Sequence, residues 1–331
     1  MREYSIRPKN YNEDQDKAIL EDIKYLTGKK NNFVTVNCPA CDLGDFTYSF
    51  KKYGFNFVIC EKCGTVFMNP RATPEILNDF YGNSAVYKYW NKNIFPASDE
   101  ARKENIVKPR VKRILDICEK YNIPTNCLVE VGAGFGTFCE TTKATGKFNS
   151  VIAIEPAKDL VDSCRAKDID VIESSIENVN FLKAQPSIVV SFEVIEHLFS
   201  PKDFLLNCKK LMAENSIIVI TCPNYEGFDI STLGLVSESI DAEHINLFNP
   251  DSIEKLFNNC GFKVLENFTP GELDADIVRN KIIEGKYKVD DQPFLKTILI
   301  DEWEKLGENF QKFLQNNRLS SHMWVVAMKI K

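Results

Sequence analysis

Four cysteines near the amino terminus have a spacing that suits metal binding. They form two Cys-x-x-Cys pairs on either side of a stretch rich in aromatic and basic residues: Cys38, Cys41, Cys60 and Cys63. Two such pairs are the ligand set of zinc ribbons, in which four thiolates surround Zn²⁺ tetrahedrally and leave no open position for catalysis. A redox site would usually have a single pair that opens a helix, whereas these pairs are predicted on loops. The spacing therefore predicts a structural zinc site.

A glycine-rich turn lies near the middle of the chain, in the segment LVEVGAGFGTF. Gly132, Gly134 and Gly136 would let the backbone approach a ligand closely at the start of a helix, where free N–H groups point outward. Glu155 ends the next predicted strand, where a carboxylate can accept hydrogen bonds from both ribose hydroxyls of an adenosine cofactor. Thr137 stands where a dinucleotide fingerprint has Gly or Ala, which counts against an NAD enzyme.

The chain has only three histidines, and histidine is the natural general base near neutral pH. His197 and His244 each follow a predicted strand, so both fall at the carboxyl end of a parallel sheet, where open α/β folds bind their ligands. Each is a candidate base, and the alternative for each is a hydrogen-bonded loop histidine. His322 begins the last predicted strand, and we expect a surface or hydrogen-bonded histidine there.

The elements that must position these residues alternate between strands and helices from residue 125 onward. One of the intervening helices, 200–215, has Ser200 as its N-cap, with Pro201 after it. This alternation indicates an α/β fold with a parallel sheet covered on both faces. The predicted strands are 127–131, 151–155, 169–174, 187–194, 216–223, 263–268 and 322–330.

Helical patterns also lie outside this region. Residues 1–30 are polar and contain at most one short helix, and a helix opened by Pro74 is predicted to stop at Gly82. A looser stretch with several aromatic residues follows it: Tyr81, Tyr87, Tyr89 and Trp90. Its three tyrosines could face a pocket or belong to the core.

The glycine turn, Glu155 and the strand order resemble the class I S-adenosylmethionine-dependent methyltransferases, over roughly residues 125–270 and the terminal strand. The resemblance implies a Rossmann-like sheet of seven strands, the last of them antiparallel, and S-adenosylmethionine as cofactor. It places the family's first motif at Glu130, Gly132, Ala133, Gly134 and Gly136, the ribose contact at Glu155 and Pro156, the adenine contact at Ser175 and Ile176, and the methionine end at Ser191, Phe192 and Glu193.

Two further segments resemble the sugar C-methyltransferases. In DAEHINLFNP, Glu243 and His244 match a Tyr-x-Glu-His segment whose histidine is the general base, but Asp241 replaces the tyrosine. The segment CEKCGTVFMNPRATPE resembles the zinc-binding domain at the front of those enzymes, although the chain leaves too little length for their C-terminal domain. The resemblance implies methyl transfer to a carbohydrate, such as a nucleotide-activated sugar in surface-glycan or secondary-metabolite biosynthesis, with His244 and Glu243 at the catalytic centre.

A second group of residues competes for the catalytic role. Glu193, Glu196 and His197 form a Glu-x-x-Glu-His cluster that His244 could approach, and such groups hold Mg²⁺ or a related ion. This cluster resembles those of small-RNA 2′-O-methyltransferases and quinone-biosynthesis O-methyltransferases. The alternatives are therefore a metal-assisted O-methyltransferase acting on an RNA 2′-hydroxyl or a small molecule, and a non-catalytic zinc-ribbon interaction protein.

The overall charge argues against a general nucleic-acid binder, because the net charge is −6 and the isoelectric point is about 5.4. Four basic residues near the cysteines could still neutralise a sugar-nucleotide pyrophosphate, or could be ordinary solvated charges: Lys51, Lys52, Lys62 and Arg71. We expect a small-molecule substrate, and the sequence is compatible with a homo-oligomer.

No apolar run approaches the length of a membrane span, and the first twenty residues lack the apolar core of a secretory signal. We therefore expect a cytoplasmic protein with reduced thiols, in which the other seven cysteines are small buried side chains. The expected units are an extension at 1–32, a zinc ribbon at 33–72 that caps the substrate end, a helical cap at 73–124, a cofactor-binding domain at 125–271, a helical insertion at 272–320 and the final strand at 321–331.

Overall fold

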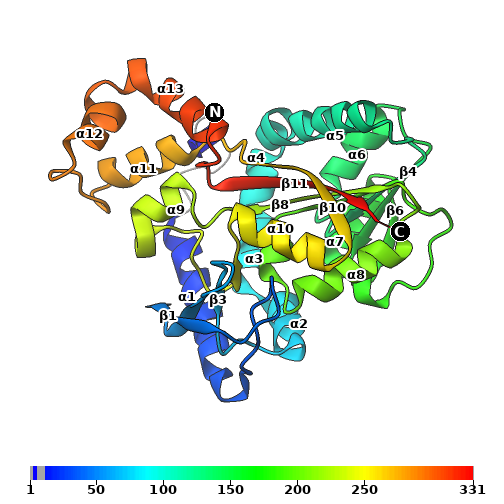
Figure 1. Cartoon of the computed structure of the whole chain (residues 1–331), viewed down its shortest axis with the longest axis horizontal. Coiled ribbons are helices and arrows are strands. Elements are labelled where there is room, and N and C mark those ends of the chain that lie inside the picture. The colour runs from blue at the N-terminus through cyan, green and yellow to red at the C-terminus, as the bar shows by residue number, and fades with distance from the viewer. Residues whose placement is uncertain (1–2, 6–11, 331) are drawn as a thin grey trace.

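The computed structural model describes residues 3–5 and 12–330. Figure 1 shows a large sheet with its helices. A smaller sheet and the helices α1 and α2 lie below the large sheet in this view, and a helical lobe lies to its left. None of the helices among the described residues is long and apolar enough to cross a membrane.

The large sheet has seven strands in the order β10-β11-β8-β7-β4-β5-β6. Strand β11 runs antiparallel to both of its neighbours, and the pairs from β8 to β6 are parallel. The seven-stranded sheet with an antiparallel last strand is thus confirmed. Its strands are β4 (Cys127–Val131), β5 (Ser150–Glu155), β6 (Asp170–Glu173), β7 (Ile188–Phe192), β8 (Ile217–Pro223), β10 (Phe262–Phe268) and β11 (His322–Lys329).

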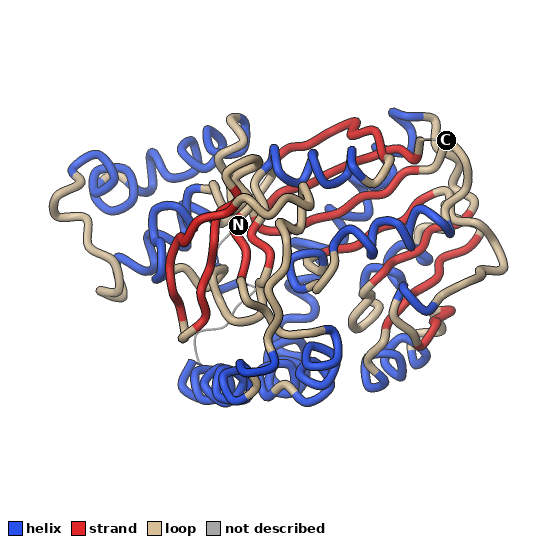
Figure 2. Tube along the Cα trace, turned by 60° about the horizontal axis from the view of Figure 1, so that its bottom comes forward, coloured by secondary structure: helices blue, strands red, loops and turns tan. Residues whose placement is uncertain are grey.

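Helices cover both faces of this sheet, as Figure 2 shows, because its central strands are apolar on both sides. Leu128 of β4 packs into a core shared with α5 and α6, whereas the adjacent Val129 packs into a core shared with α8 and α10. The covering helices are α5 (Lys108–Tyr121), α6 (Thr137–Ala144), α7 (Lys158–Ala166), α8 (Pro201–Leu211) and α10 (Pro250–Asn259).

The smaller sheet contains the expected ribbon and one strand from far along the chain. Its order is β1-β2-β3-β9, with every pair antiparallel. Strand β9 pairs Leu247 with Val66 and Asn246 with Phe67, so the cofactor-binding half of the chain completes the sheet of the ribbon. The strands are β1 (Phe46–Lys52), β2 (Phe55–Cys60), β3 (Val66–Met68) and β9 (Asn246–Leu247).

The segment before the large sheet is more helical than its sequence suggested. Helix α1 is 17 residues long, α2 continues through Gly82 instead of stopping there, and the stretch expected to be loose is helical. The cause is long-range, because the buried Asp22 carboxylate of α1 accepts hydrogen bonds from the N–H groups of Ala85 and Val86 that begin α3. The helices are α1 (Asn12–Gly28), α2 (Pro74–Asn83), α3 (Ala85–Tyr89) and α4 (Phe95–Arg102), with π-helical turns at Trp90–Ile94 and Lys103–Val107.

The helical insertion forms a lobe, and its apolar core also includes residues of α9 (Phe228–Leu233). Asp274, at the start of this lobe, is buried and accepts hydrogen bonds from Ser320 Oγ and Gln311 Nε2. It therefore ties the lobe to the residues that lead into β11. The helices of the lobe are α11 (Asp274–Ile283), α12 (Pro293–Lys296) and α13 (Trp303–Asn316), with a π-helical turn at Thr297–Asp301.

The cysteines outside the two pairs are all buried, as expected for small apolar side chains. They are Cys118, Cys127, Cys139, Cys164, Cys208, Cys222 and Cys260.

Candidate functional site

The glycine turn joins β4 to α6, and its three glycines have different surroundings. All three have positive φ, which favours glycine. A Cβ added at Gly132 would lie 2.6 Å from Val194 Cγ2, and one at Gly136 would lie 2.7 Å from Ile169 Cδ1, so both positions are closed by packing. A Cβ at Gly134 would meet nothing within 4 Å. Gly134 thus faces open space at the carboxyl end of the sheet, where a cofactor could approach the backbone.

Glu155 lies against this turn, at the end of the neighbouring strand. Its carboxylate is buried at the end of β5 and accepts hydrogen bonds from Gly134 N at 2.9 Å and Ala157 N at 3.0 Å. Burial raises the pKa of Glu155, and these two N–H donors oppose the rise. The expected ribose acceptor therefore lies against the glycine turn, next to Pro156.

The residues expected near the adenine lie beside Glu155. Ser174 N donates to Glu155 O at 3.2 Å, which holds the end of β6 against the end of β5. Ile176 is buried, and Ser175 Oγ accepts from Asn178 Nδ2. A cavity of about 300 Å³ lies beside the same turn, lined by Lys88, Asn91, Lys92, Phe135, Asp159, Leu160 and Ser163.

Glu130 lies inside β4, below the turn, and does not reach the open space directly. Its side chain is buried, and Cys139 Sγ donates to its Oε2 at 3.0 Å. Burial raises the pKa of Glu130 to about 8, so the carboxyl group is largely protonated at neutral pH. Ala133, which follows in the turn, is also buried.

The expected methionine end contains a charged group that sequence reasoning did not assemble. Glu193 follows β7 with φ +54°, and its carboxylate accepts a hydrogen bond from Thr221 Oγ1 at 2.5 Å. Arg110 Nη2 lies 3.6 Å and His322 Nδ1 lies 3.4 Å from Glu193 Oε1. Burial acts to raise the pKa of Glu193, but the charges of His322 and Arg110 outweigh it and hold the pKa below its usual value.

The neighbouring residues fix this group in place. Ser191 is buried and its Oγ donates to Val131 O at 2.8 Å, while the Arg110 guanidinium lies over the ring of Phe192. His322 is hydrogen-bonded as expected, because Trp324 Nε1 donates to its Nε2 at 3.1 Å. Its place near the site could have been predicted, since an antiparallel last strand begins at the edge where the parallel strands end.

A second polar cluster lies on the other side of the turn that follows β7. Potential ligand atoms of Glu196, His197 and His244 all lie within 4.8 Å of one another. Both carboxylate oxygens of Glu196 and Nδ1 of His197 are buried without a hydrogen-bond partner among the described residues. The structure therefore separates the expected Glu-x-x-Glu-His cluster, because Glu193 belongs to the group around Arg110 instead.

Burial also determines the protonation states in this second cluster. Burial, with the nearby Glu193 charge, raises the pKa of Glu196 well above its usual value. Burial, with His244, lowers the pKa of His197 well below its usual value, so the imidazole is neutral. Two imidazoles and one carboxyl group, close together and buried or half-buried, are a set that could act as ligands of a cation.

His244 is oriented by the segment that contains it. Its Nδ1 lies 2.9 Å from Ser239 O and 3.2 Å from Asp241 Oδ2, and the Asp241 carboxylate also accepts from the backbone N of His244. With Nδ1 donating, Nε2 is the ring nitrogen left to accept a proton. Asp241, which stands where the resembled motif has a tyrosine, thus orients this histidine.

Two tyrosines from the helical cap complete this side of the site. The rings of Tyr81 and His197 meet edge to face at 6.0 Å, and Tyr87 packs against Tyr81 at 5.7 Å. Glu243 lies by the Tyr87 hydroxyl, and burial, with Asp241, raises the pKa of Glu243 to about 8. The cap therefore brings Tyr81 to His197 and Tyr87 to Glu243.

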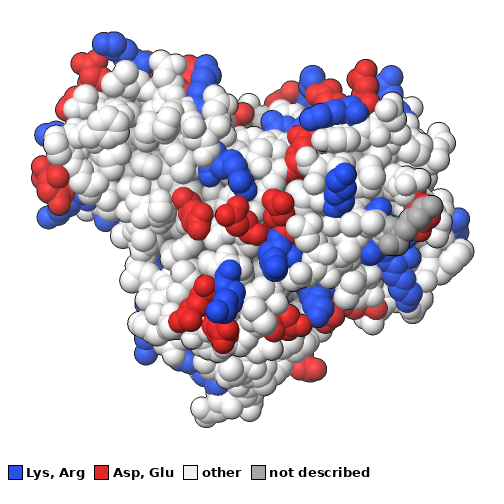
Figure 3. Space-filling view, in the orientation of Figure 1, with Lys and Arg blue, Asp and Glu red and all other residues white. Residues whose placement is uncertain are grey.

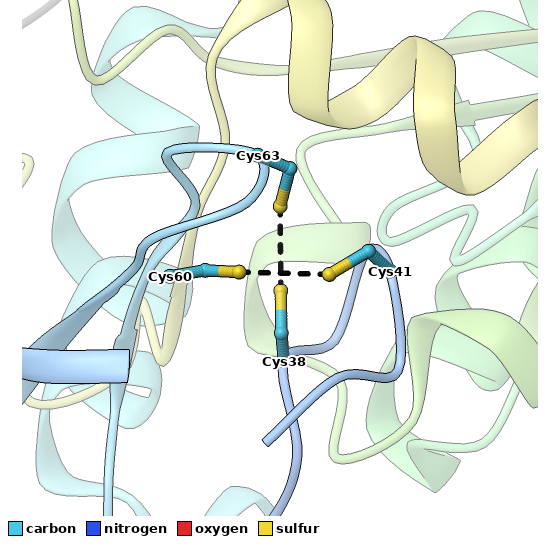
Figure 4. Close-up of side chains that lie close together, drawn as sticks. All are labelled: Cys38, Cys41, Cys60 and Cys63. Atoms are coloured by element: carbon cyan, nitrogen blue, oxygen red, sulfur yellow. Dashed lines mark hydrogen bonds between the residues drawn. The ribbon is translucent and has the colours of Figure 1, made fainter. Parts of the chain in front are cut away.

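The four cysteines of the ribbon converge on one point, as Figure 4 shows. Sγ of Cys38 lies 3.5 Å from that of Cys63, and Sγ of Cys41 lies 3.5 Å from that of Cys60. Four sulfurs at the usual Zn–S distance of about 2.3 Å would be about 3.8 Å apart, so this arrangement fits a tetrahedral zinc site.

The basic residues of the ribbon do not form an exposed anion site. Arg71 is fully buried, and its Nη1 donates to Phe199 O and Asn246 Oδ1. Lys52 is partly buried and donates to Ser237 O, while Lys62 is exposed near Asp45. Arg71 therefore cannot be a solvated charge or a pyrophosphate contact. Figure 3 shows acidic and basic side chains interspersed on the face that it presents.

Comparisons with known proteins show which family the chain belongs to. Residues 100–267, just over half of the chain, match the model of a family described as a methyltransferase domain. A probable S-adenosylmethionine-dependent methyltransferase of Mycobacterium tuberculosis is 23% identical over 137 residues, which are 41% of this chain and 48% of that protein. The mitochondrial ubiquinone biosynthesis O-methyltransferase of Dictyostelium discoideum is 26% identical, and the match covers 54% of this chain and 69% of that protein.

The chain thus spans about half the length of the mycobacterial relative that it matches. Among solved structures, a SAM-dependent methyltransferase from Archaeoglobus fulgidus is similar with a TM-score of 0.46 and 21% identity, covering 69% of this chain and 94% of that one.

Proposed function

Because this chain belongs to the methyltransferase-domain family, we propose that it transfers the methyl group of S-adenosylmethionine to a hydroxyl group of a small acceptor. The observation that carries the cofactor proposal is Gly134, whose α-carbon faces open space beside the Glu155 carboxylate. The cofactor would supply an electrophilic methyl group on its sulfonium, and the protein must orient the acceptor and remove its proton. Gly134 and Glu155 would hold the adenosine part.

The charged group around Glu193 would hold the amino-acid end of the cofactor. Arg110 is a half-buried cation and Glu193 a carboxylate of lowered pKa, which complement a zwitterion. His322 lies beside Glu193 and would form part of the same binding surface.

We assign the role of general base to His244. Its Nε2 can accept a proton because Nδ1 donates to the segment 239–241. Glu243, with Tyr87, would contact an acceptor hydroxyl, and Tyr81 would form an aromatic wall. These residues suit a polyhydroxylated acceptor, and we retain a carbohydrate as the expected class. The proposed nucleotide part of that substrate has less support, since Arg71 is buried in the interior.

A divalent cation at Glu196, His197 and His244 is the second candidate feature. The unpartnered buried oxygens of Glu196 and the unpartnered Nδ1 of His197 support it. Two imidazoles with one carboxylate suit Mn²⁺ or Zn²⁺ better than the Mg²⁺ expected from sequence. With His244 as one of its ligands, the ion would take the place of a histidine base, because it would itself lower the pKa of the acceptor hydroxyl and so favour an O-methyl product.

The four ribbon cysteines are proposed to hold a structural Zn²⁺, separate from this second cation. With four thiolates, that site is closed and has no catalytic position. The ribbon would act as a cap whose sheet includes β9, only two residues after His244.

The test starts from the acceptor. A library of sugars, sugar nucleotides, phenols and short RNAs is screened by thermal shift with S-adenosylhomocysteine present, and methylated products are analysed by NMR. We expect an O-methyl product from a small hydroxylated acceptor. His244→Ala should lower turnover about 10²-fold or more, with cofactor affinity preserved. A C-methyl product, or methylation of RNA alone, would contradict the proposal.

The cation is tested separately. Manganese binding is followed by electron paramagnetic resonance in the wild-type protein, in Glu196→Gln, and in Glu119→Gln as a matched change at an exposed position of α5. Binding should weaken in the first variant and persist in the second. Equal binding in all three proteins would remove the cation from the proposal and leave His244 as an unassisted base.

A further inference from the structure

Arg71 is a buried cation that connects the ribbon to the catalytic segments. Its backbone is fixed in the ribbon, because N donates to Val34 O at 3.0 Å and its carbonyl accepts from Val34 N at 2.9 Å. Its side chain is fully buried and leaves the ribbon, with Nε donating to Met68 O and Nη1 donating to Phe199 O at 3.2 Å and to Asn246 Oδ1 at 2.8 Å.

Asn246 extends this connection to the residues of the site. Its Nδ2 lies within hydrogen-bond distance of three carbonyl oxygens in the turn that carries Glu196 and His197, with distances of 3.3, 3.2 and 2.7 Å to Ile195, Glu196 and Leu198. Asn246 itself lies two residues after His244, in the strand that pairs with the ribbon. One guanidinium and one amide therefore fix the turn 195–199 and the strand 246–247 relative to each other.

The guanidinium of Arg71 is a charged group buried in the interior. A guanidinium remains charged in proteins, and burying it without an anion is costly. No carboxylate lies among its hydrogen-bond partners in the described part of the chain, and burial lowers the pKa of Arg71 to about 9. The three oxygen atoms that accept its hydrogen bonds therefore hold the guanidinium in place.

We propose that Arg71 is a positioning residue for Glu196, His197 and His244, and that it transmits the order of the ribbon to the turn and the strand that carry them. Loss of zinc would then disorder the acceptor side of the site and leave the cofactor side intact. The assignment of catalytic roles rests on the proposed function, whereas the connection itself rests only on the contacts above.

The experiment uses the three histidines as probes, because they lie on both sides of the site. Histidine-labelled protein is compared by heteronuclear NMR as wild type, as Arg71→Met, as Asn246→Ala and as Arg165→Met, a matched change at an exposed arginine of α7. In the first two variants the His197 and His244 signals should shift or broaden, while His322 stays unchanged because its contacts are Glu193 and Trp324. Arg165→Met should leave all three signals in place.

Cofactor affinity and zinc content are measured on the same samples. We expect affinity within about twofold of wild type, and turnover reduced about 10–100-fold, as for a misplaced catalytic group. Wild-type protein stripped of zinc by a chelator should show the same histidine changes, and stripping Arg71→Met should add little.

Two outcomes would overturn the inference. One is unchanged His197 and His244 signals in a folded Arg71→Met or Asn246→Ala variant. The other is an equal disturbance of His322 together with lost cofactor affinity, which would indicate general destabilisation. If Arg71→Met does not fold, Asn246→Ala carries the test. If no methyl transfer to a hydroxyl is found, the proposed function fails while the NMR result still decides this connection.

Discussion

At the scale of single residues, Glu130 and Glu155 illustrate how position decides the role of a carboxyl group. Both lie on neighbouring strands near the glycine turn. Glu155 stands at a strand end and accepts two backbone N–H groups, whereas Glu130 lies within β4 and has the Cys139 thiol as its partner. Glu155 is therefore placed to contact a ligand, and Glu130 is placed to support the turn from below.

The raised pKa of Glu130 predicts a pH-dependent contribution to stability. Its pKa rises from the usual 4.5 to about 8 on folding, so the native state holds a proton that the unfolded state releases. This contribution is complete below pH 4.5 and is lost as the pH rises through about 8. The free energy of unfolding of wild type relative to Glu130→Gln should therefore fall between these values, by at most about 1.4 kcal/mol per pH unit. Urea unfolding from pH 5 to 9 measures it, and parallel profiles would contradict the assignment.

At the scale of elements, the ribbon depends on the rest of the chain as much as on its cysteines. Strand β9 supplies one edge of its sheet, and Asn249 Nδ2 donates to Cys63 O at 3.4 Å. The two cysteine pairs bring the segments 38–41 and 60–63 together. A small unit of this kind has little apolar core, so a bound metal would contribute much of its stability.

We expect about one zinc ion per chain, and its loss in Cys60→Ser. The variant should also melt at a lower temperature, because the thiolates would no longer be cross-linked through the metal. Elemental analysis and thermal melting measure both effects. Cys118→Ser is the matched control, since Cys118 is buried in α5 away from the ribbon, and it should keep its zinc. Equal zinc in Cys60→Ser and wild type would exclude the four-cysteine site.

Local patterns in the sequence were sufficient for the large sheet and insufficient for the connections between its parts. The strand 127–131 could be predicted because an apolar run ends in a glycine turn, and the same reasoning located Gly134 and Glu155. The pairing of Asn246 with Phe67 and the burial of Arg71 could not, because both depend on segments far apart in the chain. Likewise, Glu193 and Glu196 share a motif but point to different partners, since the turn after β7 has a left-handed residue at Glu193.

At the scale of the whole molecule, the helical lobe and the large sheet meet at one buried carboxylate. Asp274 accepts hydrogen bonds from Gln311 of α13, from Ser320 and from the backbone N of Ser321, directly before His322. The lobe is therefore attached next to the charged group around Glu193. The lobe also shares its apolar core with Phe228 and Leu233 of α9.

Removing this carboxylate should loosen the lobe. Asp274→Ala leaves several buried donors unpaired, and we expect a loss of roughly 2–4 kcal/mol in the free energy of unfolding. Hydrogen exchange should increase in α11 and α13 and remain slow in β4 and β7. Asp290→Ala, at an exposed position of the same lobe, should change stability by less than about 0.5 kcal/mol. Exchange that increases equally throughout the large sheet would show that the lobe has no separate stability.

The central claim is that the open glycine turn beside Glu155 binds S-adenosylmethionine, and calorimetric titration tests it most directly. The variants are Glu155→Ala, Gly134→Val and Gly146→Val. Gly134 and Gly146 both have positive φ and open space at Cβ, so both valine variants have a similar backbone strain, but only Gly134 lies in the turn. Wild type and Gly146→Val should bind the cofactor, while Glu155→Ala and Gly134→Val should bind at least about tenfold more weakly. Absence of binding by the wild-type protein, or equal affinity in all four, would contradict the account.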